Sequence, residues 1–174
     1  KYGRFLGNAV QGDLGDSYFF KRPALDVIID KLVPTLELVF GATIIIIVLS
    51  IPLGVYTAIH PNTVFTKIVM ALSSVGISIP VFLTAIMLTY IFAIELGWLP
   101  SFGRGDPGSL LGFESSYFTL DGLTHLILPC IALSSIMLPL FIRLVRSEML
   151  EVLSSEYIKF ARAKGLALNK IYYQ

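Results

Sequence analysis

The sequence predicts an all-α membrane protein, a polytopic bundle of transmembrane helices, on three observations. Hydrophobic residues make up 55% of the 174 residues and the mean hydropathy is +0.79. Only 14% of the residues are charged, whereas soluble domains average about 25%. The apolar residues are concentrated in three uncharged runs, residues 38–59, 68–94 and 122–142. Each run reaches the roughly 20 residues that a helix needs to cross about 30 Å of hydrocarbon.

Charge and residue usage exclude several classes of function. A net charge of +1 provides no broad basic surface, so no nucleic-acid partner is expected. The single cysteine, Cys130, lies inside the third run, and His60 and His125 lie at the ends of different runs, so no metal cluster is visible. The uncharged runs argue against a proton relay or a voltage sensor, which need ionisable groups in the membrane. We therefore expect no catalytic residue, no metal and no bound cofactor.

Lysine and arginine in the short loops predict the orientation, because cytoplasmic loops are enriched in them. Residues 143–174 hold six basic residues, which are Arg143, Arg146, Lys159, Arg162, Lys164 and Lys170. Residues 60–67 hold one lysine and no acid, whereas residues 95–121 hold Arg104 among four acids. The first two segments are therefore expected inside and the third outside. Residues 1–34 would also lie outside, although their five basic residues conflict with the rule.

The first segment is expected to contain a short amphipathic helix over residues 23–32. Pro23 suits the first turn of a helix, and apolar residues recur at helical spacing, with two acids on another face. These residues are Leu25, Ile28, Ile29 and Leu32, with Asp26 and Asp30. The helix is expected to lie along the outer membrane surface, or else only to pack on the bundle. Trp98, directly after the second run, fits an aromatic anchor at the interface.

Small, hydroxyl and proline residues in the second and third runs support two interpretations. The candidates are Ser74, Gly76, Ser78, Pro80, Thr84, Ser134 and Ser135. Small residues let helices approach closely in lipid. Pro80 frees a backbone carbonyl, which is tolerated where it faces protein or a wet cavity. These residues therefore either line a translocation pathway or form a helix-packing face.

A second short helix is predicted after the third run, at residues 156–164. Ser155 can cap its first turn, where Glu156 favours the positive helix end. Lys164 lies in the last turn and Gly165 can supply the left-handed residue that follows. One face carries Tyr157, Phe160 and Ala161, whereas Lys159 and Arg162 point elsewhere. A helix of about nine residues is not stable alone, so it needs a partner surface. The alternative is a helix lying on the membrane surface.

Several motifs occur in a fixed order along nearly the whole chain. They are Gly12-Asp13-Leu14-Gly15, Leu32-Val33-Pro34-Thr35-Leu36-Glu37-Leu38, Leu96-Gly97-Trp98-Leu99-Pro100, His125-Leu126-Ile127-Leu128-Pro129 and Ala161-Arg162-Ala163-Lys164-Gly165-Leu166. With these motifs in this order, the chain resembles the permease subunits, of the permease B type, of bacterial ABC importers for di- and oligopeptides and nickel. The resemblance implies a helix bundle of the type I ABC importer class, with a cytoplasmic coupling helix and an outer amphipathic helix.

The last motif corresponds to the family's coupling loop, whose pattern begins with Glu-Ala-Ala and continues to a glycine. Lys159, Phe160 and Ala161 occupy the first three places and Gly165 that of the glycine, so the Glu and the first Ala are absent. The resemblance implies that nine residues couple to the ATPase. They are Glu156, Tyr157, Lys159, Phe160, Ala161, Arg162, Ala163, Lys164 and Gly165.

The expected organisation follows from the runs and from the resemblance. Residues 1–34 are the extracytoplasmic segment, 35–60 a transmembrane helix, 61–67 a cytoplasmic hinge, 68–94 a second transmembrane helix, 95–121 an extracytoplasmic loop, 122–145 a third transmembrane helix and 146–174 a truncated coupling loop. The resemblance also implies one further span before residue 1 and about two after residue 174.

The resemblance implies a transport subunit of the bacterial cytoplasmic membrane that is not itself an enzyme. Its partners would be a second permease subunit, two cytoplasmic ATPase subunits that use ATP and Mg, an extracytoplasmic substrate-binding protein and membrane lipid. No Gly-x-x-x-x-Gly-Lys-Ser/Thr loop occurs in the chain. Peptides are the expected cargo, and a nickel chelate, glutathione or a sugar could be carried instead. The competing classes are a secondary transporter and a membrane scaffold without transport activity.

Overall fold

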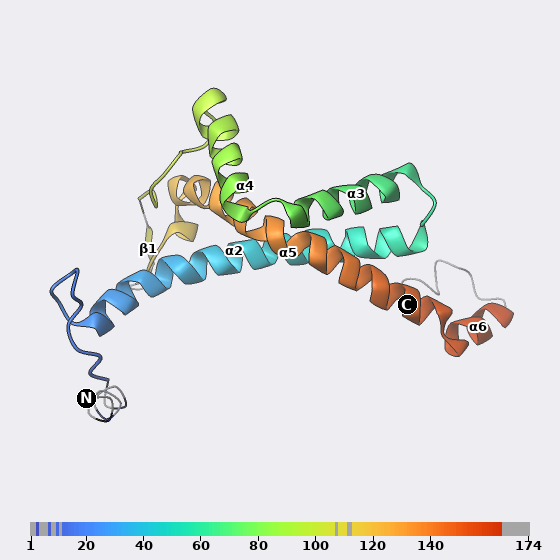
Figure 1. Cartoon of the computed structure of the whole chain (residues 1–174), viewed down its shortest axis with the longest axis horizontal. Helices are drawn as coiled ribbons and strands as arrows, with labels where there is room; N and C mark the ends of the chain where they lie inside the picture. Colours follow the sequence, from blue (N-terminus) through green and yellow to red (C-terminus); the bar gives the residue numbers. More distant parts are fainter. Residues whose placement is uncertain are drawn as a thin grey trace.

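The computed structural model describes residues 3, 7, 10, 12–106, 108–110 and 113–164 (Figure 1). Its helices are α2 (Ala24–Ile59), α3 (Val64–Ser78), α4 (Val81–Leu88), α5 (Leu120–Ser154) and α6 (Glu156–Ala163), with a π-helix η1 (Thr89–Glu95) and a 3-10 turn η2 (Ser116–Phe118). Two three-residue strands, β1 (Gly108–Leu110) and β2 (Phe113–Ser115), form an antiparallel hairpin. Helix dominates the described residues, so the predicted all-α class is confirmed.

Helices α2 and α5 form the centre of the bundle and pack against each other (Figure 1). They have 36 and 35 residues, and both are apolar and long enough to cross a membrane. The bent pair of Val64–Ser78 and Val81–Glu95 would be a third crossing if it counts as one span. At about 1.5 Å per residue, α2 is roughly 54 Å long, which exceeds the hydrocarbon thickness.

The first transmembrane helix is longer than expected. Residues 24–32 are helical, as predicted, but they form the first turns of α2 rather than a separate short helix. Pro34 lies inside α2 and does not end it. Apolar residues continue at helical spacing on both sides of this proline, and a proline can bend a helix without ending it. The sequence pattern therefore did not reveal that the two segments are one helix.

The second run does not form one continuous span, which corrects the expectation of a single helix over residues 68–94. Helix α3 ends at Ser78, and the segment from α4 to η1 leaves at 108° to it. Ile79 is extended, because a residue before proline is driven out of the α region. Pro80 then becomes the N-cap of α4 and its carbonyl accepts from the backbone N–H of Leu83 and Thr84. In Figure 1, α4 rises from the bundle at a steep angle to α3, with its base against α5.

Helix α5 continues for nine residues past the predicted end of the third span at residue 145 and finishes at Ser154. The coupling segment therefore begins as helix, and Arg143 and Arg146 belong to α5. Figure 1 places α6 and the α2–α3 connection at one end of the bundle, and the β1–β2 hairpin at the other. These are called the α6 end and the hairpin end. Which end faces the cytoplasm stays a prediction.

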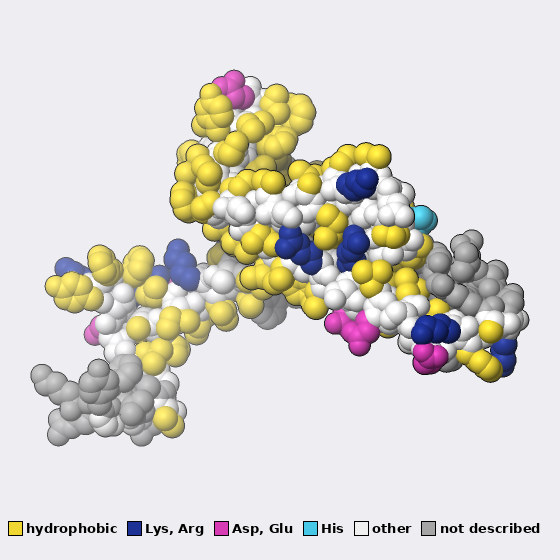
Figure 2. All heavy atoms as spheres, turned by 45° about the vertical axis from the view of Figure 1, so that its right-hand side comes forward, with side chains coloured by type: hydrophobic (Ala, Val, Ile, Leu, Met, Phe, Trp, Pro, Cys, Tyr) yellow, Lys and Arg dark blue, Asp and Glu magenta, His cyan; other side chains and the backbone are white. Residues whose placement is uncertain are grey.

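Small residues allow α2 and α5 to approach closely. A Cβ atom added to Gly54 would lie 2.6 Å from the side chain of Val145, and one added to Gly41 would lie 2.6 Å from Cys130 Sγ. Ala42, Ser50, Thr57, Ala58 and Ser134 are buried. Close backbone approach is the usual way helices associate in lipid. Many large apolar side chains point outward instead, and Figure 2 shows hydrophobic atoms over much of the visible face.

Candidate functional site

Helix α6 begins where the sequence predicts it. Ser155 has an extended backbone, and its Oγ accepts from Ile158 N at 3.5 Å. This bond satisfies one of the N–H groups that a helix start leaves without an intrahelical partner. Glu156 lies in the first turn, and Lys164 N donates to Phe160 O at 3.1 Å directly after the helix. The predicted helix and its cap are confirmed, whereas Gly165 lies outside the described residues.

A single residue joins α6 to α5. Ser155 separates Ser154, the end of α5, from Glu156, the start of α6. The N–H of Ser155 donates to Val152 O at 3.1 Å, and the carbonyl of Ser155 accepts from Lys159 N at 3.1 Å. The joint is thus hydrogen-bonded into both helices. A force on α6 therefore reaches α5 without an intervening flexible loop.

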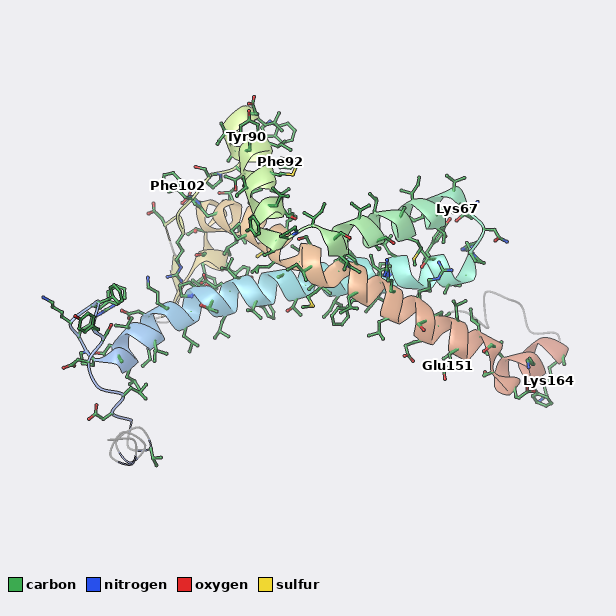
Figure 3. The ribbon with its side chains drawn as sticks, in the orientation of Figure 1. Lys67, Tyr90, Phe92, Phe102, Glu151 and Lys164 are labelled. Carbon is green, nitrogen blue, oxygen red and sulfur yellow. The ribbon has the colours of Figure 1, made fainter. Side chains whose placement is uncertain are left out.

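Two described charged side chains of α6 pair with each other, and Lys164, directly after the helix, lies over one of its aromatic rings. Lys159 Nζ lies 2.8 Å from Glu156 Oε1, and both side chains are exposed. Lys164 Nζ lies 4.6 Å from the centroid of the Phe160 ring, which is a cation–π distance. Figure 3 labels Lys164 and shows it at the far end of the bundle. Phe160 remains 59% exposed beneath this cation.

The buried contact of α6 comes from a residue that the sequence analysis did not select. Ile158 is 5% exposed, whereas Phe160, which was expected on the face that meets a partner, is exposed. Ala163 is exposed too. The side chains of Tyr157, Ala161 and Arg162 lie outside the described part. Residues 157, 158, 160 and 161 are all apolar, so more than one side of the helix could pack within the protein. The branched aliphatic side chain of Ile158 was the feature that could have identified the buried side.

Two candidate residues of the second run contact α5. Ser74 Oγ accepts from Arg143 Nη2 at 2.6 Å, and a Cβ added to Gly76 would lie 3.2 Å from Pro139 Cγ. Both contacts join α3 to α5. For Ser74 and Gly76 the structure therefore favours the helix-packing interpretation over the pathway-lining one.

The other candidates of the second and third runs mostly bond within their own helices. Ser78, Ser134 and Ser135 donate to the carbonyls of Ser74, Ile131 and Ala132, at 3.3, 2.9 and 2.7 Å respectively. Pro80 lies at the break between α3 and α4, and Thr84 lies half-buried on α4. Ser135 lines a hollow of about 290 Å³ with Leu53, Leu72 and Pro139, and none of the other six candidates lines it.

A polar cluster at the hairpin end was not expected from the sequence. Glu37, on α2, is 5% exposed, and its Oε1 accepts from Arg104 Nη2 at 3.0 Å and from Ser116 N at 2.9 Å. A charged group in a spanning helix is costly unless it is paired. Arg104 is the only base among residues 95–121. A lone acid at the start of an apolar run was the signal that could have predicted this pair.

Tyr117 closes the cluster against the backbone of α2. Its hydroxyl donates to Glu37 O at 2.6 Å, and Cys130 Sγ lies 3.7 Å from Leu38 O. Burial, with the nearby Cys130 and Glu37, raises the pKa of the Tyr117 hydroxyl, so it stays protonated as a donor. Gly41 makes this approach possible, because a Cβ there would lie 2.8 Å from Tyr117 Oη.

The chain is similar over its whole length to known transport proteins. It is 36% identical over 186 residues to the dipeptide transport system permease protein DppB of Alkalihalophilus pseudofirmus, covering 100% of this chain and 56% of that protein. It is 34% identical over 175 residues to the oligopeptide transport system permease protein AppB of Bacillus subtilis, covering 100% of this chain and 54% of that protein.

A third relative has a different named cargo. The chain is 31% identical over 167 residues to the glutathione transport system permease protein GsiC of Escherichia coli, covering 96% of this chain and 49% of that protein. The chain thus spans about half the length of the curated relatives it matches.

The family model for the inner membrane component of binding-protein-dependent transport systems matches residues 50–174. This range includes α3, α4, α5 and α6 and the end of α2 from Ser50 onward. The family is one of transport components, and the apolar helices described above are compatible with a place in the inner membrane. The chain belongs to the binding-protein-dependent transport system inner membrane component family.

Proposed function

We propose that the chain is part of the membrane-spanning permease subunit of an ATP-driven importer, and that it forms part of the pathway for di- or oligopeptides. The observation that carries the proposal is the joint at Ser155, which connects the short exposed helix α6 directly to α5. An importer needs such an element, because the energy source and the spans are on different subunits. The dipeptide and oligopeptide permeases among the relatives support the cargo.

In the proposed mechanism, α6 sits in a groove of a cytoplasmic ATPase subunit. Closure of the ATPase subunits on ATP displaces α6, and α5 moves with it as one body, which is a rigid-body transition at an interface. Because α5 packs closely against α2 through Gly54 and Gly41, the displacement reaches the hairpin end. Opening and closing of the pathway at the two ends can then alternate.

The partners are inferred from the family to which the chain belongs. The complete complex would contain a second permease subunit, two ATPase subunits that use ATP and Mg, and a substrate-binding protein outside the membrane. The chain itself would do no phosphoryl chemistry and would not be an enzyme. With α6 at the cytoplasmic face, the hairpin end faces outward, which agrees with the lysine and arginine distribution of the loops.

The test is uptake by the full-length subunit, co-assembled with its partner subunits and the binding protein in vesicles. Uptake of a labelled dipeptide or oligopeptide that requires both ATP and the binding protein is the expected result. Uptake of glutathione without uptake of peptides would identify glutathione as the cargo, as in the name of the glutathione permease relative. Uptake of a nickel chelate or of a sugar, without peptide uptake, would replace peptides as the cargo. Uptake driven by an ion gradient would indicate a secondary transporter, and a complex without uptake a scaffold.

A further inference from the structure

The cluster of Glu37, Arg104, Ser116 and Tyr117, here called the Glu37 cluster, joins parts of the chain that are far apart in sequence. Glu37 lies on α2, Arg104 lies between η1 and β1, and Ser116 and Tyr117 belong to η2. The cluster therefore holds the described part of residues 96–119 (96–106, 108–110 and 113–119), here called the hairpin segment, against α2 at the hairpin end. The hairpin segment leads directly into α5 at Leu120.

The hydrogen bonds of the Glu37 cluster make the attachment specific. The Glu37 carboxylate accepts one charged bond from Arg104 and one backbone bond from Ser116, which is fully buried. Charge-assisted bonds are roughly twice as strong as neutral ones, and removing one partner of a buried pair leaves an uncompensated charge. By contrast, Arg22 and Asp30 form a pair at 2.8 Å with side chains 44% and 53% exposed. Such an exposed pair contributes little.

The Glu37 cluster also lies at the start of a continuous mechanical connection. Ser116 Oγ lies 3.4 Å from Arg104 O, and Tyr117 holds the α2 backbone just before α5 begins. Helices α2 and α5 then pack together toward the α6 end, where Gly54 meets Val145. A displacement of the hairpin segment is therefore passed to both long helices, and through Ser155 to α6.

We propose that Glu37 and Arg104 are positioning residues that tie the hairpin segment to α2 and α5, so that docking of the extracytoplasmic binding protein at this end of the protein reaches both helices. The pair keeps the hairpin segment and the two helices in one rigid body. Without it, the binding protein would still dock, but its docking would no longer stimulate the ATPase subunits. This inference rests on the proposed function.

The test uses the full-length subunit in its complete complex in vesicles. ATP hydrolysis is measured without and with the substrate-loaded binding protein, for wild type, Glu37→Gln and Arg104→Gln. The expected result is an unchanged basal rate and a loss of stimulation of about 5- to 150-fold, the usual range for coupling between two sites. Arg104→Lys, which keeps the charge and can still donate to the Glu37 carboxylate, should restore most of the stimulation. Asp30→Asn, which breaks the exposed pair, is the matched control and should behave as wild type.

A second measurement reports directly whether the hairpin segment stays attached to α2. Spin labels are placed at Phe102 and Leu49, whose side chains are 87% and 42% exposed, in a Cys130→Ala background. Figure 3 labels Phe102, which lies near the hairpin. The wild-type complex and Asp30→Asn should give a narrow distance distribution, whereas Glu37→Gln and Arg104→Gln should give a broad one.

The outcomes separate this inference from the proposed function. Normal stimulation in both glutamine variants would overturn the role of the pair, whether or not the distance distribution broadens, and would leave the proposed function intact. A wild-type complex without ATP-dependent uptake would overturn the proposed function and this inference with it. If the glutamine variants do not insert, Tyr117→Phe removes only the bond to Glu37 O, and it must reduce stimulation for the inference to stand.

Discussion

Ile158 and Phe160 are two residues apart on α6 and have opposite surroundings. Ile158 is 5% exposed and Phe160 is 59% exposed. Ile158 belongs to the side by which α6 packs within the protein, because its side chain is buried. Phe160, with Lys164 over its ring at 4.6 Å, belongs to the side that remains open to a partner. The two residues therefore separate the attachment of α6 from the recognition by an ATPase subunit that we propose, and each can be tested alone.

Phe160→Ala should weaken binding of the ATPase subunits about tenfold or more, because large aromatic side chains dominate protein interfaces. The subunit should still insert and fold, since the side chain is exposed in the isolated chain. Co-purification of the ATPase subunits with the complete permease measures the effect. Phe118→Ala, at a similarly exposed aromatic on the hairpin end, is the control. Equal ATPase recovery in the two variants would remove Phe160 from the interface.

Ile158→Ala should loosen α6 itself. Truncating a buried isoleucine to alanine costs about 2–5 kcal/mol, so the amides of α6 should exchange with solvent faster. Hydrogen exchange of the complete subunit, followed by mass spectrometry, reports this directly. In Phe160→Ala the same amides should exchange at the wild-type rate. Unchanged exchange in Ile158→Ala would mean that this side chain does not hold α6 in place.

Gly165→Asp should reduce uptake and ATPase association while leaving the subunit inserted. The sequence predicts a left-handed residue after α6, and this conformation costs a residue with a side chain roughly 1–2 kcal/mol. Uptake and co-purification are measured together, with Asn169→Asp, outside the nine candidate coupling residues, as a control that changes the charge by the same amount. Normal uptake and normal ATPase recovery in Gly165→Asp would favour the membrane-surface helix as the role of this segment.

Gly54→Ala should destabilise the α2–α5 packing, because its Cβ would lie 2.6 Å from the side chain of Val145. Overpacking of this kind typically costs about 1–3 kcal/mol. The midpoint of thermal unfolding in detergent should fall more for Gly54→Ala than for Gly76→Ala, whose Cβ would lie 3.2 Å from Pro139 Cγ. The reverse order would contradict the described approach of α2 and α5.

Cysteine labelling tests the orientation. In a Cys130→Ala background, an impermeant reagent added outside should modify a cysteine at position 113 and spare those at positions 65 and 157. The expectation follows from the excess of lysine and arginine in the segments at the α6 end. Labelling of position 157 in sealed cells would reverse the assignment of the two ends.

The sequence predicted what depends on local pattern. The three uncharged runs, the cap at Ser155 and the helix that follows it all result from residues near one another in the chain. Pro80 was recognised as a proline that frees a backbone carbonyl, but the 108° break beside it was not predicted. The direction in which a helix continues after a break depends on tertiary packing. The continuity of α2 through Pro34 was missed, since helical periodicity does not indicate where one helix ends and the next begins.

The candidate sites show the same difference between features set by the local sequence and features set by contacts distant in the sequence. The pair of Glu37 and Arg104 joins residues 67 positions apart, and no local pattern reports a contact of that range. Only the cost of a lone charge in an apolar helix pointed to it. The buried residue of α6, Ile158, was not predicted, because apolar residues lie on more than one side of this helix of eight residues and its local sequence does not say which of them packs within the protein.

The length of α2 has a consequence for the bilayer around the protein. At a tilt of about 40°, the upper end for membrane helices, its roughly 54 Å project onto about 41 Å. That matches the about 40–45 Å of a bilayer with its headgroups, rather than the hydrocarbon alone. The acids Asp26 and Asp30, in the first two turns, then lie at headgroup depth. A thinner membrane would force α2 to tilt further or lift those turns into water, so lipid chain length becomes a variable in the energetics of this subunit.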